Sequence, residues 1–78
     1  MPSFNYDGQQ FNYPSWIAQD FRHNKKLALA YKKYFILLFN ALREAAPNME
    51  IEKRETIARI NGVKLMQYLG MIGFKKTF

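Results

Sequence analysis

The chain has no cysteine among its 78 residues, so it forms no disulfide bonds and offers no thiolate ligands to zinc. It has a single histidine, His23, and a metal site would therefore consist almost wholly of carboxylates. The stretch GMIG lacks the lysine and the glycine spacing of a phosphate-binding loop. We therefore expect no cofactor and no metal.

Catalytic groups are equally scarce. Asp20 and His23 would share one face of a helix, with Ser15 nearby, which is the minimum for a nucleophilic triad. A chain of this length has no room for a shaped pocket and an oxyanion hole as well. We expect that the protein is not an enzyme and that His23 lies at the surface.

Long apolar runs are also absent. The longest apolar cluster, residues 34–39, is far shorter than the roughly 20 residues that a membrane helix needs. The first ten residues, MPSFNYDGQQ, lack the basic start and apolar run of a secretory signal. The sequence therefore predicts a cytoplasmic protein without a membrane partner.

What the chain does contain is apolar side chains and positive charge. Hydrophobic residues make up 49% and aromatic residues 17%, which is typical of one small packed domain spanning 1–78. Twelve Lys and Arg against six Asp and Glu give a net charge of +6. This balance favours an acidic partner such as nucleic acid, an anionic membrane surface or an acidic protein; alternatively, the charge only maintains solubility.

The first segment, 1–14, is expected to be an aromatic β-hairpin. Phe-Asn-Tyr occurs twice, and the intervening Asp7-Gly8 suits a two-residue turn in which both residues have positive φ. This turn places Phe4 opposite Phe11 on one face. The aromatic face is predicted to be a lid over the core, with a stacking platform for bases as the less favoured alternative.

The second segment, 15–46, is expected to hold a short helix from Ser15 and a long central helix. Asn24 is the predicted N-cap of the long helix, which ends before Pro47. This helix is expected to lie between the hairpin and the C-terminal part, with Phe35, Ile36 and Phe39 pointing sideways or backwards. Its predicted inward stripe comprises Leu27, Tyr31, Tyr34, Leu38, Ala41, Leu42 and Ala45.

Two apolar residues of the long helix, Leu29 and Ile36, fall on its otherwise charged arc. Exposed apolar residues of this kind suggest a homodimer. The alternative is that the N-terminal aromatic residues cover them.

The third segment, 49–78, is predicted to begin with a helix whose inward contacts are Ile51, Ile57 and Ile60. Asn61-Gly62 then indicates a turn, and a second short helix from Val63 ends at Gly70. Beyond that glycine, Met71 and Ile72 are expected to run extended, with one of them packed inward. Gly73 would turn the chain and project Lys75 and Lys76 as a short basic wing or tail.

The stretch TIARINGVKLMQYLG resembles the helix-turn-helix family. The similarity rests on a small residue in the first helix, Ala58, a glycine in the turn, Gly62, and an apolar residue after it, Val63. With the following LGMIGFKKTF it resembles the winged-helix variety over residues 56–76, or 24–78 if the long helix is counted. Asn61 departs from the pattern, because the family usually has an apolar side chain there.

This resemblance implies a mainly α domain with a helix-turn-helix-like C-terminal half, and a regulator that binds duplex DNA. Lys75 and Lys76 would contact backbone phosphates, while Lys64 and Gln67 would lie nearest the bases. The complete set of expected nucleic-acid contacts is Arg59, Lys64, Gln67, Tyr68, Lys75 and Lys76.

A different class of function stays open, namely a compact phage- or plasmid-type protein that binds and inhibits or modulates a host or regulatory protein. Aromatic residues and methionine are enriched at protein interfaces. The residues that motivate this alternative are Trp16, Phe35, Ile36, Phe39, Leu65 and Met66.

Overall fold

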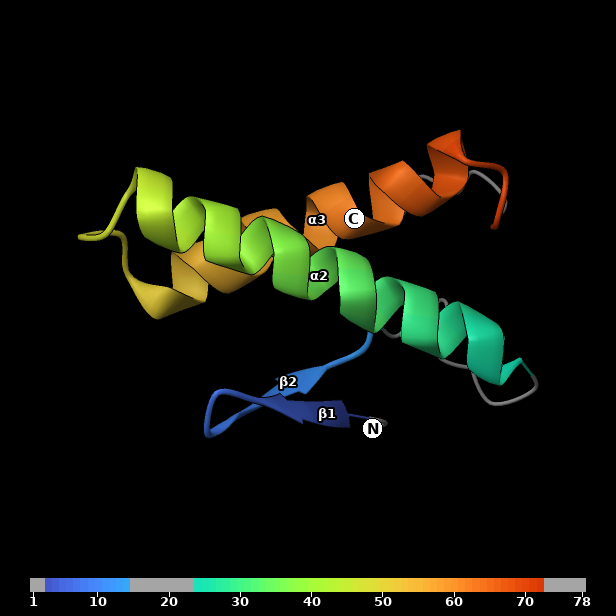
Figure 1. The fold of residues 1–78 in the computed structure, drawn as a ribbon, viewed down its shortest axis with the longest axis horizontal. Coiled ribbons are helices and arrows are strands. Elements are labelled where there is room, and N and C mark those ends of the chain that lie inside the picture. The colour runs from blue at the N-terminus through green and yellow to red at the C-terminus, as the bar shows by residue number, and fades with distance from the viewer. Residues whose placement is uncertain (1–2, 15–23, 73–78) are drawn as a thin grey trace.

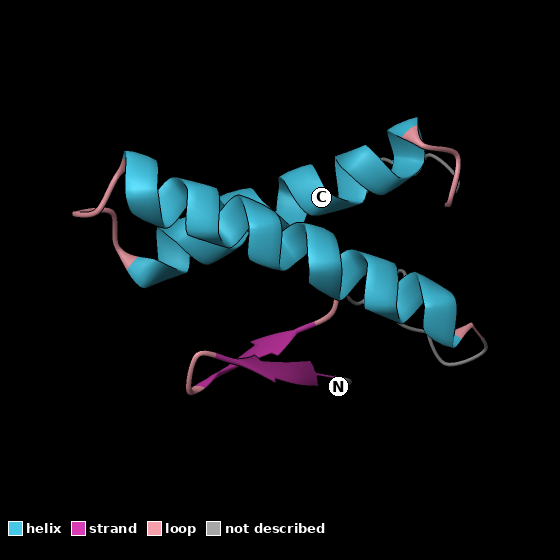
Figure 2. Cartoon of the chain, viewed as in Figure 1, coloured by secondary structure: helices cyan, strands magenta, loops and turns pink. Residues whose placement is uncertain are grey.

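The computed structural model describes residues 3–14 and 24–72, which form a β-hairpin followed by two packed helices (Figures 1 and 2). The elements are β1 (Ser3–Tyr6), β2 (Gln9–Asn12), α2 (Lys25–Ala45) and α3 (Ile51–Tyr68). The prediction of a small, mainly helical domain with an N-terminal hairpin is confirmed. The short helix predicted from Ser15 lies outside the described residues.

The hairpin has the predicted turn and register. Asp7 and Gly8 have φ of 53° and 76°, as a two-residue turn with positive φ at both positions requires. β1 and β2 pair antiparallel with Phe4 opposite Phe11. Because side chains alternate along a strand, this register puts both phenylalanines on the same face.

That face covers the middle of α2. Phe4 and Phe11 are buried, and their ring centroids lie 5.4 and 5.0 Å from that of Phe35. Tyr6 adds a hydrogen bond from its hydroxyl to Asn40 Oδ1 at 2.8 Å. The hairpin is therefore a lid over the core. A base-stacking platform on this face is excluded for the folded chain because its phenylalanine rings are covered.

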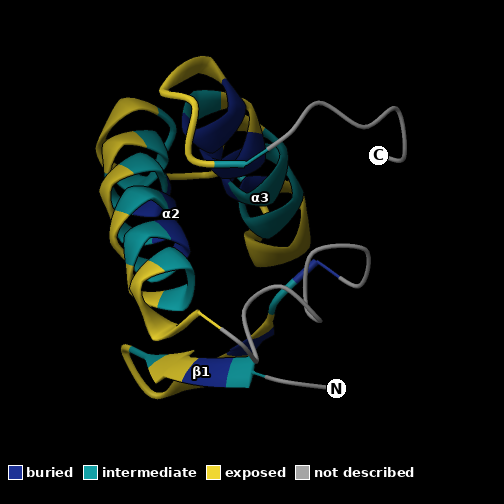
Figure 3. Cartoon of the chain, turned by 90° about the vertical axis from the view of Figure 1, so that its right-hand side faces the viewer, coloured by how far each residue is buried: buried dark blue, intermediate teal, exposed yellow. Residues whose placement is uncertain are grey.

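Helix α2 begins and ends where the sequence predicted. Asn24 Oδ1 accepts a hydrogen bond from the Lys26 amide at 3.1 Å, which satisfies one of the free amides of the first turn. The last helical residue is Ala45, two positions before Pro47. The hairpin and α3 both pack against α2, on neighbouring sides of it rather than on the opposite sides that were expected. Figure 3 shows the buried stretches of α2 turned towards α3.

The predicted inward stripe of α2 is right only in part, since its Leu27, Tyr34, Leu38 and Leu42 pack partly against the core. The buried residues are Tyr31, Phe35 and Phe39, of which only Tyr31 was in the predicted stripe, whereas Ala41 and Ala45 are exposed. The three rings stand one turn apart in a column, where the hairpin rings and α3 both reach them. Burying a large ring removes more apolar area from water than burying an alanine does, so the rings determine which side of the helix faces the core.

Helix α3 runs unbroken from Ile51 to Tyr68, so the turn predicted at Asn61-Gly62 is wrong. The positive-φ glycines of the described residues are Gly8 and Gly70, and Gly62 has helical backbone geometry. Gly62 instead allows a close approach to α2, since an added Cβ would lie 3.8 Å from both the Phe35 amide nitrogen and the Tyr31 ring. The helix-turn-helix arrangement over these residues is therefore not present.

The inward contacts predicted for α3 are also wrong. Ile51 is exposed, and Ile57 and Ile60 are only half-buried. Where two helix backbones approach closely, small residues must occupy the contact, so the isoleucines are turned away from it. The buried residues of α3 are Arg54, Ala58, Gly62, Val63, Met66 and Gln67.

Arg54 is the one buried cation of this helix, with 7% of its surface exposed. Its Nη2 donates to the carbonyl oxygens of Ala46 and Met49, at 3.3 and 3.0 Å. Its guanidinium also lies 5.5 Å from the centroid of the Phe39 ring. Because the Ala46 carbonyl is at the negative end of the α2 dipole, Arg54 both caps α2 and fixes the loop to α3.

Helix α3 ends as predicted at a glycine with positive φ. The amide of Gly70 donates to the Gln67 carbonyl and the amide of Met71 to the Met66 carbonyl, which is the Schellman arrangement. Ile72 packs partly against the core, as one residue of this pair was expected to do. No wing strand is present up to residue 72, and the predicted wing lysines, Lys75 and Lys76, lie outside the described residues.

Candidate nucleic-acid interface

The described charges are segregated along the molecule. Residues 24–43 and 56–72 contain no Asp or Glu. Figure 1 shows the start of α2 and the end of α3 at one end of the molecule, with the hairpin turn and the α2–α3 loop at the other. The described acidic residues, all on or near those two turns, are Asp7, Glu44, Glu50, Glu52 and Glu55.

We call the opposite part of the molecule the basic end and define it by Lys25, Lys26, Lys33 and Lys64, of which Lys33 lies about 12 Å along α2 from its start, towards the middle of the molecule. All four of these lysines are exposed. Asn24 positions the first two of them by capping the helix on which they stand. Lys32 is half-buried because its ammonium lies over the Phe4 ring, 5.9 Å from the centroid. The basic end therefore presents ammonium groups with no described carboxylate on the same stretches of helix.

The cations at the acidic end have other roles. Arg43 forms an ion pair with Asp7 at 2.9 Å, and Arg54 is buried against the loop. Lys53 is exposed, but it stands between Glu52 and Glu55 in the first turns of α3. A polyanion would therefore meet an unfavourable field at this end of the molecule.

One face of α3 carries an exposed aromatic ring close to a lysine. Asn61, Lys64 and Tyr68 are exposed and spaced three and four residues apart, so they lie on one side of the helix. We call these three residues the α3 outer face. Tyr68, with 85% of its surface exposed, is the most exposed of the described large apolar side chains.

The structure brings together only two of the predicted contact residues, Lys64 and Tyr68. Arg59 lies about 140° around the helix from Lys64, because the two are five residues apart. Instead, Nη1 of Arg59 lies 3.8 Å from Oε1 of Glu55. Gln67 has only 4% of its surface exposed and cannot reach a base in this conformation, so its predicted place nearest the bases is wrong. Lys75 and Lys76 lie outside the described residues.

Sequence reasoning missed Asn61 as a member of the α3 outer face and did not name the α2 lysines of the basic end among the nucleic-acid contacts. The signal was available, because positions 61, 64 and 68 share one side of any continuous helix. The expected turn at Asn61-Gly62 obscured this spacing, because it put Asn61 in a turn and Lys64 and Tyr68 in a separate helix.

Two tyrosines in the core have raised pKa values. Burial raises the pKa of the Tyr31 hydroxyl far above its ordinary value of 10.0, although the nearby Arg59 partly opposes this effect. Burial also raises the pKa of Tyr13. Desolvation of the phenolate explains both shifts, so neither one is an argument for a catalytic site.

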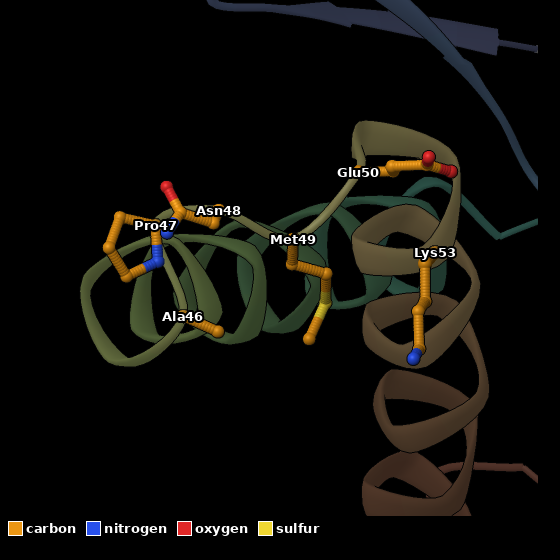
Figure 4. A pocket seen from close by; sticks show the side chains of 6 residues that line it. All are labelled: Ala46, Pro47, Asn48, Met49, Glu50 and Lys53. Carbon is orange, nitrogen blue, oxygen red and sulfur yellow. The ribbon is translucent and has the colours of Figure 1, made fainter.

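An open hollow of about 490 Å³ borders the α2–α3 loop (Figure 4). In that view the carboxylate of Glu50 and the ammonium of Lys53 point in different directions, so the polar groups at its edge do not converge on a common point. The lining residues are Ala46, Pro47, Asn48, Met49, Glu50 and Lys53. Across the described ranges, no cluster of His, Asp or Glu has the arrangement of a metal site.

Neither of the two described helices has the length and apolar character that crossing a bilayer requires. No family model matches the chain, and no curated protein or solved structure is significantly similar to it.

Proposed function

We propose that the protein binds nucleic acid through its basic end. The observation that carries this proposal is the segregation of charge, with four exposed lysines on stretches of α2 and α3 that hold no carboxylate and the described carboxylates on or near the two turns. Phosphate groups along a strand bind such a set of ammonium groups and release condensed counterions. Duplex DNA is the partner that the sequence favours, and a role in regulation is part of the same proposal.

The proposed contacts are mainly with the phosphate backbone. With α3 continuous and Gln67 buried, residues 24–72 hold no helix-turn-helix pair, and few of their side chains can read base edges. Lysine contacts to phosphates position a protein without selecting a sequence. We therefore expect affinity for many sequences alike.

The test is a titration of fluorescently labelled duplex DNA, followed by anisotropy at several salt concentrations. For the parent chain, the logarithm of the affinity should fall linearly with the logarithm of the salt concentration. The triple variant Lys25→Gln/Lys26→Gln/Lys33→Gln should bind more weakly, and its salt slope should be flatter by up to about three. These lysines are exposed, so the variant should keep its fold, which circular dichroism checks.

Lys53→Gln is the matched control, because it removes an exposed lysine of the same kind from the acidic end. It should leave both affinity and salt slope close to those of the parent chain. The proposal is overturned if the parent chain binds neither this duplex nor a single-stranded oligonucleotide at low salt, or if Lys53→Gln weakens binding as much as the same substitution at Lys26.

A second candidate function is binding to a protein, and one observation favours it. Leu29 and Leu37 keep 66% and 58% of their surface exposed on the same outer side of α2, with Lys33 between them. Exposed leucines grouped in this way are typical of contact surfaces. Ile36, by contrast, packs partly against the core, and Phe35, Phe39 and Met66 are buried in it, so they are not available to a partner.

A second copy of this chain is the partner that can be tested directly. Sedimentation at high micromolar concentration should show a dimer, and Leu29→Gln/Leu37→Gln should shift it towards the monomer. A parent chain that stays monomeric at that concentration excludes the homodimer.

A further inference from the structure

Tyr68 is the last residue of α3 and is 85% exposed. Tyrosine is ordinarily at least partly buried, because its ring contributes a large apolar area to packing. At this position the ring contributes little to the fold. Its two flat faces are open to a ligand.

The surroundings of the ring favour an anionic ligand with a flat group. Lys64 stands one helical turn before Tyr68 on the α3 outer face, and no carboxylate occurs from residue 56 to residue 72. Asn61 stands a further turn away, and its amide nitrogen donates to the Ile57 carbonyl at 2.8 Å, which fixes the side chain on this face. An aromatic ring beside an ammonium group is the combination that binds one nucleotide of an unpaired strand, with the base on the ring and the phosphate on the lysine.

On this basis we infer that the nucleic acid bound at the basic end is single-stranded, and that Tyr68 stacks on one of its bases. The inference rests on the proposed function and names the class of nucleic acid for that site. A duplex would use Lys64 but not Tyr68, because its bases are already stacked on one another and would have to be flipped out to reach the ring. An unpaired strand uses both side chains.

The test compares a labelled oligothymidylate of about ten nucleotides with a labelled duplex that has the same number of phosphates. The parent chain should bind the single strand more tightly at equal salt. Tyr68→Ala should lower affinity for the single strand at least about five-fold and leave affinity for the duplex unchanged. Tyr68→Phe is the matched control and should bind as the parent does, because stacking needs the ring and not the hydroxyl group.

Nuclear magnetic resonance gives a second measure. Stacking should shift the Tyr68 ring protons upfield when oligothymidylate is added, and an oligouridylate arm shows whether RNA binds in the same way. Lys64→Gln should flatten the salt slope by about one for either nucleic acid, because it removes one phosphate contact.

The two proposals fail in different ways. If the chain binds nucleic acid with a salt dependence but Tyr68→Ala equals the parent on the single strand, the stacking inference is overturned and the proposed function stands. Tighter binding of the duplex than of the single strand also overturns it. If neither nucleic acid binds at low salt, the proposed function is overturned and the inference with it.

Discussion

Gly62 of α3 lies against the backbone of α2 at Phe35, and a β-carbon added to Gly62 would be 3.8 Å from the Phe35 amide nitrogen. This distance is an ordinary van der Waals contact, so the interface has room for a methyl group and little more. Ala58, one turn earlier, is fully buried in the same helix. Two small residues one turn apart thus set the closeness of the two helices.

The first prediction concerns Gly62. Gly62→Ala should stabilise the protein by about 0.5–1 kcal/mol, because alanine fits the available space and costs less conformational entropy in a helix than glycine. Gly62→Val should destabilise it by about 1–3 kcal/mol, because the added methyl groups meet the Phe35 backbone and the Tyr31 ring. Urea unfolding followed by circular dichroism measures both.

The same pair of variants separates a helix from a turn at this position. In a turn with positive φ, alanine would itself be strained and Gly62→Ala would lower stability. A loss of stability in Gly62→Ala would therefore contradict a continuous α3.

The second prediction concerns Arg54. Arg54→Met should destabilise the fold by about 2 kcal/mol or more, because the carbonyl oxygens of Ala46 and Met49 lose a charged donor in a partly buried place. Methionine keeps most of the side-chain volume, so the loss reports the polar contacts. Thermal or urea unfolding measures it.

Lys53→Met is the control, because it removes a neighbouring exposed cation. It should change the free energy of unfolding by no more than about 0.5 kcal/mol. Equal effects of the two substitutions would show that the contacts of Arg54 with the loop do not stabilise the fold.

The third prediction concerns the docking of the hairpin on α2. Tyr6→Phe should cost about 1 kcal/mol, because it removes the donor to Asn40 Oδ1 across 34 positions of sequence. A double-mutant cycle with Asn40→Ala should give a coupling energy of about 0.5–1.5 kcal/mol. A coupling energy of zero would mean that the hairpin does not dock in this register.

The fourth prediction is a dependence of stability on alkaline pH. The pKa of Tyr31 is raised by burial, so the folded chain holds this proton more tightly than the unfolded chain does. Its contribution is fully present below the ordinary pKa of 10.0 and is lost as the pH rises above it towards the folded value. The unfolding free energy should therefore fall above that pH by up to about 1.4 kcal/mol per pH unit for this group.

Tyr31→Phe removes the titrating hydroxyl and should make the alkaline loss of stability less steep. The measurement compares the slope of unfolding free energy against pH in the parent chain with that in Tyr31→Phe. The lysines titrate in the same pH range, but they contribute equally to both slopes, so the difference reports Tyr31. Identical slopes would show that Tyr31 does not titrate differently in the folded and unfolded states.

Local sequence signals predicted the elements that local geometry decides. Asp7-Gly8 gave the hairpin and its register, Asn24 gave the start of α2, and Gly70 gave the end of α3. In each case the deciding interaction lies within a few residues of the signal. The same is true of Pro47, which limits α2.

The failures involve contacts between distant parts of the chain. Ala58 was expected to allow a close helix approach, but Gly62 was expected in a turn, with the approaching helix directly after it. The partner is α2 instead, so Gly62 stays helical. A glycine that follows an asparagine favours a turn by local propensity, and packing against Tyr31 and Phe35 overrides that preference.

The candidate site could be predicted only in part for the same reason. Lys64 and Tyr68 were named from the sequence, and both are exposed on one face. Gln67 was named with them but is buried, because the side of α3 that faces inward depends on how the helix rotates against α2. A single sequence position carries no information on that rotation.

The segregation of charge also gives the described part of the molecule an electric dipole along its long axis, which extends 36 Å. The two poles lie farther apart than the screening length of roughly 10 Å at 0.1 M salt. A charged support can therefore attract one pole while salt screens its interaction with the other. On a cation-exchange resin the protein should therefore adsorb with the start of α2 and the end of α3 towards the matrix. The loop at Pro47 and Asn48 would then point into the buffer, and a dye or affinity tag inserted there would remain accessible while the opposite pole is engaged.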